Sequence, residues 1–336
     1  MWEHQSVLRR ILIWMTADYA IETSDLRKTY RSRWRRREVR AVDGISLRVA
    51  RGATFGLLGP NGAGKTTFVK LLLSAVIPTG GTARVFGRDV HEPEARRPVG
   101  YLPENHRFPT YFTGSGMLDF YAALSGMSAA DRRPRIPELL ELVGLEQWGA
   151  MRIGKYSKGM LQRLGLAQAI MHSPSLLILD EPSDGVDPMG RRHIREILGG
   201  LEEKGVTIFI NSHLLAEVEL FCSEVAIVHK GRVALSGKVK ELIAGKGYKL
   251  TAAQVPEALE TALRERAVGV AARDGVIDFQ FATREDANEA IDLLRRENCA
   301  IEALSQTSST LEDVFVRTIG NGGAVASEPK AAEVTA

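Results

Sequence analysis

From residue 21 onward, apolar and polar residues first alternate in short runs, and later recur at the spacing of helices. Residues 21–58 alternate in runs of strand length, which predicts strands joined by tight turns. Residues 105–170 are rich in leucine and alanine at helical spacing. Residues 176–235 alternate short apolar runs with helical segments, as in a buried parallel sheet. The pattern predicts an α/β fold with a parallel sheet.

The composition changes near residue 245, and residues 246–320 predict a separate small α+β domain. Strand and helix patterns follow one another there in the order β-α-β-β-α-β, which is ferredoxin-like in outline. Ile277, Phe279 and Phe281 share one face of a predicted hairpin whose turn is Asp274-Gly275. We expect this accessory domain to serve in dimerisation or packing, or alternatively to sense a ligand that regulates the rest of the chain.

Two capping boxes are predicted in this C-terminal region. Thr283 and Asp286 would open one helix, and Ser309 and Glu312 would open the closing helix. Residues 321–336 are small and polar, which predicts a disordered tail.

Composition narrows the class of protein. The 336 residues are 44% hydrophobic and 25% charged, as in globular proteins, and a net charge of +3 alone does not indicate nucleic acid. The two cysteines form no disulfide framework, which favours a reducing cytosolic compartment. Residues 1–20 are expected to be an N-terminal extension, because their apolar patch is interrupted by arginines and is too short for a spanning helix or signal peptide.

Six arginines lie between Arg31 and Arg40. They are compatible with contact to anionic lipid headgroups or with a solvated hairpin tip. The sequence favours the solvated hairpin tip.

A glycine-rich loop between an apolar strand and a helix carries the clearest chemical signal. Gly59, Gly64, Lys65 and Thr66 have P-loop spacing, and the helix FVKLLLSAV follows them directly. Glycines let the backbone curl closely around phosphates with its N–H groups inward, and the helix N-terminus adds positive potential. We expect Lys65 to reach the β and γ phosphates of ATP and Thr66 to hold Mg²⁺. The expected nucleotide-binding residues of this loop are Gly59, Pro60, Asn61, Gly62, Ala63, Gly64, Lys65, Thr66 and Thr67.

The stretch SLLILDEP predicts a buried strand that carries two acidic residues to its carboxyl end, where α/β ligands bind. Asp180 is expected to hold Mg²⁺, usually through water. Glu181 is expected to orient the water that attacks the γ-phosphate.

YSKGMLQR, residues 156–163, resembles the signature sequence of ABC ATPases. Four further stretches resemble motifs of that family and occur in family order: LRKTY, YLPEN, SDGVDP and NSHLLAEVE. The resemblance runs from about Leu26 to Gly237. It implies an ABC cassette at 21–245, with a mostly parallel sheet, an antiparallel β subdomain and a helical subdomain at about 105–170.

The resemblance also implies roles for further residues. Tyr30 would stack on adenine, Glu104 would contact Mg²⁺ or the attacking water, and His213 would act as the switch histidine. Ser157 and Gly159 of the signature, with Asp187 of the D-loop, would complete the ATP site of a second subunit. Ser157 could alternatively serve only as a helix cap.

Two positions depart from the family pattern. Lys158 replaces a glycine of the signature, and its cation would aid phosphate binding or face solvent. Glu104 replaces the usual glutamine and adds negative charge beside Asp180 and Glu181. Both departures resemble those of exporter-type ATPases encoded separately from their permeases.

We therefore expect an ATP-hydrolysing subunit of an ABC transporter, at the cytoplasmic face of the cell membrane, whose partners are a polytopic permease and a second ATPase subunit. Homodimer and heterodimer are both open, as is the transported substrate. The aromatic stretch at Phe108, Tyr111 and Phe112 would contact the permease, or would pack the helical subdomain. The alternative is a soluble ABC ATPase acting on nucleic acid or ribosomes. A single P-loop and the absence of sustained heptads argue against that class, so no nucleic acid is expected.

Overall fold

The computed structural model describes residues 18–31, 38–105, 107–273 and 275–320. The chain divides into two compact units, which are described separately. One runs to Lys238 and includes the residues from Arg317 onward, and the other is Val239–Val316. The predicted disordered tail and most of the predicted N-terminal extension lie outside the described residues. Strand β1 already begins at Tyr19, before the boundary expected at residue 21.

The first unit is built on a six-stranded sheet in the order β10-β9-β3-β8-β7-β6. All neighbours are parallel except β10 and β9. Every residue of β3, β7 and β8 is buried, because helices or a second sheet cover both faces of these apolar strands. The strands are β3 (Thr54–Leu58), β6 (Val99–Leu102), β7 (Leu176–Asp180), β8 (Thr207–Asn211), β9 (Glu224–His229) and β10 (Arg232–Lys238).

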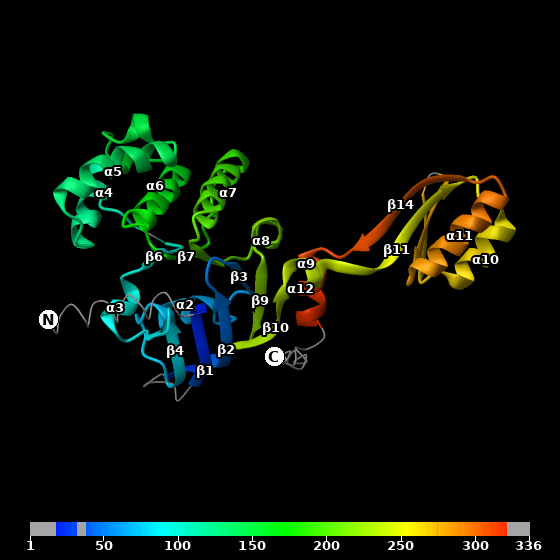
Figure 1. Cartoon of the computed structure of the whole chain (residues 1–336), viewed down its shortest axis with the longest axis horizontal. Coiled ribbons are helices and arrows are strands. Elements are labelled where there is room, and N and C mark those ends of the chain that lie inside the picture. The colour runs from blue at the N-terminus through cyan, green and yellow to red at the C-terminus, as the bar shows by residue number, and fades with distance from the viewer. Residues whose placement is uncertain (1–17, 32–37, 106, 274, 321–336) are drawn as a thin grey trace, which may run out of the picture. The chain divides into compact units, whose positions relative to one another are not determined.

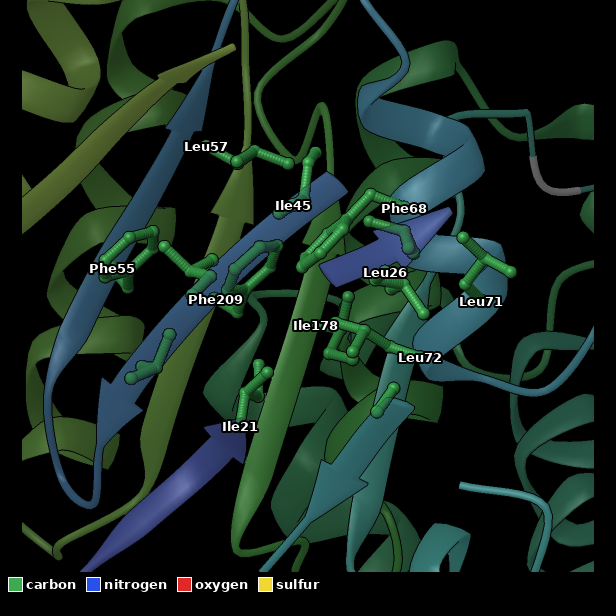
Figure 2. Close-up of a cluster of buried hydrophobic side chains, with 14 of the residues drawn as sticks. Ile21, Leu26, Ile45, Phe55, Leu57, Phe68, Leu71, Leu72, Ile178 and Phe209 are labelled. Carbon is green, nitrogen blue, oxygen red and sulfur yellow. The ribbon is translucent and has the colours of Figure 1, made fainter. Parts of the chain in front are cut away.

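A four-stranded antiparallel sheet in the order β2-β1-β4-β5 packs against the first sheet through a shared core. Phe209 of β8 stacks on Phe55 of β3 and on Phe68 of helix α2, with ring centroids 5.7 and 6.1 Å apart (Figure 2). The apolar residues of α2 thus pack into the core that both sheets share. The elements are β1 (Tyr19–Arg31), β2 (Glu38–Ala50), β4 (Gly80–Val85), β5 (Arg88–Asp89) and α2 (Lys65–Leu72).

Helices α4, α5 and α6 gather into the predicted helical subdomain (Figure 1). Among the described residues, none of the helices combines the length and apolar character that crossing a membrane requires. The helices of this unit are α3 (Pro93–Arg96), α4 (Gly114–Leu124), α5 (Ala129–Leu142), η1 (Glu146–Trp148), η2 (Ile153–Lys155), α6 (Lys158–Ile170), α7 (Pro188–Glu202) and α8 (Leu215–Phe221).

The second unit carries an antiparallel sheet in the order β12-β13-β11-β14, with α10 and α11 packed on its apolar face. Phe279 and Phe281 of β13 are fully buried, and Ile277 is 9% exposed. The elements are α9 (Val239–Ile243), β11 (Ala244–Ala253), α10 (Glu257–Arg266), β12 (Gly269–Arg273), β13 (Val276–Phe281), α11 (Arg284–Arg296) and β14 (Ala300–Ser308). Helix α12 (Leu311–Gly320) extends across the division between the units.

One of the two predicted capping boxes is found where expected, and the other is displaced by one residue. Thr283 accepts the backbone N–H of Asp286 and donates its hydroxyl proton to that carboxylate. The closing helix is capped by Thr310 and Asp313, so the prediction of Ser309 and Glu312 is wrong. The N–H of Ser309 instead donates to the carbonyl of Ile243, because strand pairing continues up to that point.

Candidate active site

The glycine-rich loop lies at the carboxyl end of β3 and leads into α2. Gly64 is the N-cap of α2 with φ of 107°, and a Cβ there would overlap the backbone carbonyl of Ala41 in β2. The N–H of Gly231, in the turn between β9 and β10, donates to the Ala63 carbonyl at 2.9 Å. The loop therefore lies against β2 and the turn between β9 and β10, both of which are remote from it in sequence.

Lys65 is 8% exposed, and its Nζ donates to the carbonyl oxygens of Gly59 at 2.7 Å and Pro60 at 3.4 Å. Burial lowers the pKa of the Lys65 ammonium, while Glu181, Asp180 and Glu104 oppose that shift. A phosphate group entering the loop would compete with the two carbonyls for this ammonium.

Asp180 ends β7 directly beside Asn211, which ends the parallel strand β8. The Asn211 side-chain amide donates to the Asp180 carboxylate. Burial raises the pKa of Asp180 to about 6, and Glu104 and Glu181 add to the rise, while Asn211 and Lys65 oppose it. Burial is thus the main reason that the neutral form of Asp180 is favoured, and the two neighbouring carboxylates add to it.

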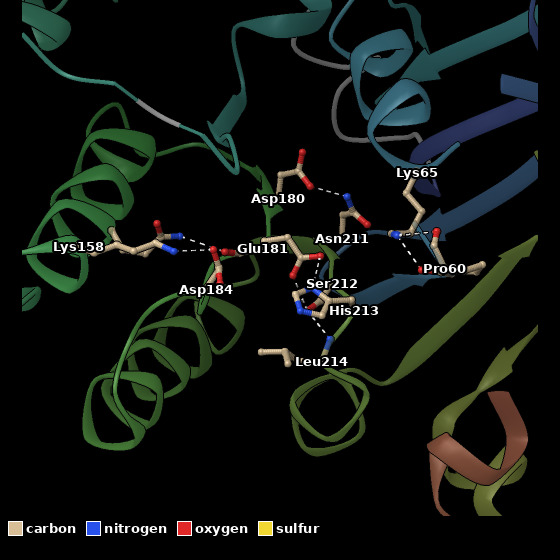
Figure 3. A network of polar contacts seen from close by, with 12 residues as sticks. Pro60, Lys65, Lys158, Asp180, Glu181, Asp184, Asn211, Ser212, His213 and Leu214 are labelled. Carbon is tan, nitrogen blue, oxygen red and sulfur yellow. Dashed lines mark hydrogen bonds and ion pairs between the residues drawn. The ribbon is translucent and has the colours of Figure 1, made fainter. Parts of the chain in front are cut away.

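Glu181 follows Asp180 in a left-handed backbone conformation with φ of 53°. Its N–H donates to the Asn211 carbonyl at 2.8 Å, so the neighbouring strand holds this turn. Its Oε1 lies 2.8 Å from His213 Nδ1, and Ser212 Oγ donates to its Oε2 at 3.1 Å (Figure 3). The carboxylate is thus directed by two consecutive residues after β8.

These side chains line one cavity of about 480 Å³. The structure brings Tyr30, residues Asn61–Thr67, Glu104, Asp180, Glu181 and His213 to it from segments that are far apart in sequence. Gly59 and Pro60 lie behind it as partners of Lys65. Tyr30 is 41% exposed at the cavity edge, with Lys28 Nζ 5.2 Å from its ring centroid. The cavity has the dimensions and the charge distribution for a nucleotide.

Besides Gly59 and Pro60, three expected nucleotide-binding residues do not line this cavity. Ser157 caps α6 by accepting the N–H of Met160, and Asp187 caps α7 by accepting that of Gly190. Gly159 has nothing within 4 Å of the position where a Cβ would stand, so close approach from outside is open. Within one chain, Ser157 and Asp187 act as helix caps.

The residues around Asp180 suit a hydrated Mg²⁺ bound together with phosphate. The Oδ1 atom of Asn211 is buried without a hydrogen-bond partner, and three carboxylates add negative charge nearby. Within the part of the chain that the structure describes, no group of three His, Cys, Asp or Glu side chains could hold a metal ion. Oxygen ligands from water and phosphate would complete the shell, as Mg²⁺ prefers.

The structure adds four polar residues that the sequence analysis does not identify. Asn211 and Ser212 contact Asp180 and Glu181, as described above. Gln162 of α6 donates to the backbone carbonyls of Glu181 and Pro182, and Asp184 forms an ion pair with Lys158 at 2.8 Å. Asn211 ends a buried strand and Ser212 follows it, which is a signal that sequence inspection could have used.

A separate groove of about 1090 Å³ lies between β6 and the helical subdomain, with Phe108 and Tyr121 in its lining. Phe108 contacts Tyr121 edge-on at 6.2 Å, and Tyr111 stacks on Phe112 at 4.9 Å. Phe112 also contacts Phe120 of α4. Phe108 and Phe112 therefore contact rings of α4, whereas Tyr111 is 72% exposed. Of the three predicted contact residues, only Phe108 lines the groove.

Comparison with known proteins places the chain in a family. The family model described as ABC transporter matches residues 42–184. The bacitracin transport ATP-binding protein BcrA of Enterococcus faecalis is 36% identical, over 92% of this chain and 99% of that protein. The Nod factor export ATP-binding protein I of Ralstonia nicotianae is 36% identical, over 84% and 90% respectively. A solved ATP-binding subunit of an ABC transporter is 29% identical with a TM-score of 0.61, over 66% of this chain and 91% of that one. The chain belongs to the ATP-binding proteins of ABC transporters, a family of ATP hydrolases.

Proposed function

We propose that this chain hydrolyses ATP in the cavity around Lys65, with Glu181 as the residue that polarises the attacking water. The observation that carries the proposal is that Lys65, Asp180 and Glu181 converge there from separate segments. Lys65 and the inward N–H groups of the loop offset phosphate charge, and Tyr30 stacks on adenine. His213, held against Glu181, contacts the γ-phosphate during transfer.

Mg²⁺ would be held by Thr66 and Asp180, with Glu104 near the same cavity. When bound, it would offset the charge on the transferring phosphoryl group. Burial favours the neutral form of Asp180, and a bound cation would favour the charged form of its carboxyl group, which suits the residue to this role.

Two such subunits would close on two ATP molecules. Ser157, Gly159 and Asp187 are absent from the cavity lining of their own chain, which supports a role at the ATP of a second subunit. The N-terminus of α6 would present its positive potential to that γ-phosphate. ATP hydrolysis would then reopen the dimer.

A separate membrane permease would receive this motion at the groove beside β6. Apolar and aromatic side chains such as Phe108, Tyr121 and Leu124 line it, and it is large enough for a protruding helix. This partner would keep the chain at the cytoplasmic face of the membrane. Export is supported by the relative named for Nod factor export.

The hydrolysis proposal is tested with three purified variants. Glu181→Gln should bind MgATP normally, lose most turnover and accumulate as a closed dimer. Lys65→Ala should lose nucleotide affinity by about 10- to 100-fold, because it loses charge-assisted contacts. Wild-type turnover by Glu181→Gln would remove Glu181 from the mechanism, and wild-type affinity of Lys65→Ala would remove Lys65 from the site. His91→Ala, at an exposed histidine outside the site, is the control.

The transporter proposal is tested by gentle extraction of the tagged chain from native membranes and mass spectrometry of what co-purifies. A stoichiometric polytopic protein is expected. Recovery only from the soluble fraction, alone or with ribosomes or DNA, would overturn the permease proposal and leave the ATPase activity in place.

A further inference from the structure

Gln162 is a buried polar residue in the signature helix whose amide reaches out of that helix. Its side chain is 3% exposed, and Nε2 donates to the carbonyl oxygens of Glu181 at 3.2 Å and Pro182 at 2.9 Å. Both bonds go to backbone atoms of the turn that carries the proposed water-polarising residue. Because an unpaired buried amide is costly, these contacts determine where the turn lies relative to α6.

The Glu181 backbone needs such support. Its φ of 53° lies in the left-handed region, which disfavours residues with a Cβ. Asn211 holds the peptide from one side by accepting the Glu181 N–H, and Gln162 holds it from the other by donating to the Glu181 carbonyl. The conformation directs the carboxylate toward His213 and Ser212.

A second contact joins the same helix to the same loop. Lys158 lies one turn before Gln162, and its ammonium pairs with Asp184 at 2.8 Å. A Cβ on Gly185 would overlap the aliphatic part of the Lys158 side chain, so the glycine leaves room for it. The first two turns of α6 are thus attached to residues 181–185 by the buried Gln162 amide and by the exposed Lys158–Asp184 ion pair. Figure 3 shows the ion pair.

We infer that Gln162 is a positioning residue for ATP hydrolysis: it holds Glu181 in its left-handed conformation and links that residue to the signature helix of the same chain. The inference rests on the proposed role of Glu181. A displacement of α6 when its N-terminus meets a second subunit's nucleotide would be transmitted through the Gln162 amide to the Glu181 backbone. Both described hydrogen bonds of Gln162 go to the backbone carbonyls of Glu181 and Pro182, and neither goes to the phosphate-binding loop at residues 59–67.

The first test removes the two donors and keeps the shape. Gln162→Met in the full-length chain should lower kcat by about 10- to 100-fold, because the carboxylate is displaced, while the Kd for MgATP stays within about twofold. Gln147→Met, the same change at an exposed glutamine of the helical subdomain, is the control. Unchanged kcat for a folded Gln162→Met protein, or a raised Kd with unchanged kcat, would overturn the inference.

A double variant separates positioning from a general structural role. Because Gln162 acts through Glu181, Gln162→Met should have no further effect on the residual rate of Glu181→Gln. A further loss of the same size as in the wild-type background would overturn the inference. Wild-type turnover of Glu181→Gln alone would instead contradict the proposed function, so the two failures are distinguishable.

If Gln162→Met does not fold, the pH dependence of kcat in the Gln162→Glu variant tests the inference instead. A neutral carboxyl group can donate one O–H to a carbonyl, whereas a carboxylate repels both carbonyls, and burial raises the pKa of such a group. The ratio of its kcat to that of the wild type should therefore rise severalfold as the pH falls from about 8 to 6. A ratio that does not change with pH would overturn the inference.

Discussion

The imidazole Nδ1 of His213 lies 2.8 Å from Oε1 of Glu181, although the two residues follow different strands of the sheet. Asp180 and Asn211 are paired across β7 and β8, so the two side chains meet just beyond the strand ends, one residue after Asp180 and two residues after Asn211. Glu181 is nearly buried, whereas the His213 side chain is 53% exposed. His213 can therefore reach a nucleotide while remaining in contact with the carboxylate.

His213→Ala should bind MgATP with unchanged affinity and hydrolyse it about 100-fold more slowly, because a contact to the transferring phosphoryl group is lost. Single-turnover hydrolysis and equilibrium binding measure the two quantities separately. Equal hydrolysis rates for His213→Ala and the wild type would demote His213 to a structural role.

The pH dependence of stability should report the buried carboxyl group of Asp180. Its pKa of about 6 in the folded chain exceeds the unfolded value of about 3.9, so the folded state binds the proton more tightly. The charged form is therefore destabilising above about pH 6, and stability from this group rises as the pH falls toward 4.

Asp180→Asn should consequently raise the free energy of unfolding at pH 7 by up to about 3 kcal/mol in nucleotide-free protein. The gain should disappear toward pH 4. Chemical denaturation at several pH values measures this difference. If Asp180→Asn is no more stable than the wild type at pH 7, burial of the charged Asp180 carboxylate does not destabilise the folded chain.

Two glycines of the phosphate-binding loop should respond differently to the same substitution. Gly64→Ala should cost at least about 2 kcal/mol of stability, because the Cβ meets the Ala41 carbonyl and φ is 107°. Gly62→Ala should cost only about 1 kcal/mol, since its φ is 79° but no atom lies within 4 Å of the new Cβ. Urea denaturation without nucleotide compares the free energies of unfolding of the two variants. Equal losses of stability would contradict the close approach of the Ala41 carbonyl in β2 to Gly64.

The Lys158–Asp184 pair offers a test of what the signature lysine does. Both side chains are about half exposed or more, so Lys158→Met and Asp184→Asn should each change stability by under about 1 kcal/mol. If the pair acts as a unit, each variant should lower turnover by up to about fivefold, and the double variant no further.

The alternative role of Lys158, contact with phosphate of a second subunit's ATP, makes a different prediction. Lys158→Met would then raise the KM for ATP, while Asp184→Asn would not. Steady-state kinetics of the two single variants decide between these roles.

Short-range patterns were sufficient for much of this protein, because they depend on residues close together in sequence. The phosphate-binding loop between β3 and α2, the buried strand that ends in Asp180 and the Thr283 cap all follow from local spacing. The second cap shows the limit. Ser309-x-x-Glu312 and Thr310-x-x-Asp313 are equivalent as local patterns, and only the pairing of β14 with β11 selects the latter.

The contacts that organise the site depend on which strands become neighbours, and no local pattern contains that information. Asn211 meets Asp180 because β8 lies beside β7, and Gln162 meets the Glu181 backbone because α6 packs over the same turn. The amino-acid sequence by itself predicted which residues would bind phosphate and polarise water. Only the tertiary structure decided how they are held, since burial, strand register and the left-handed turn at Glu181 arise when remote segments pack together.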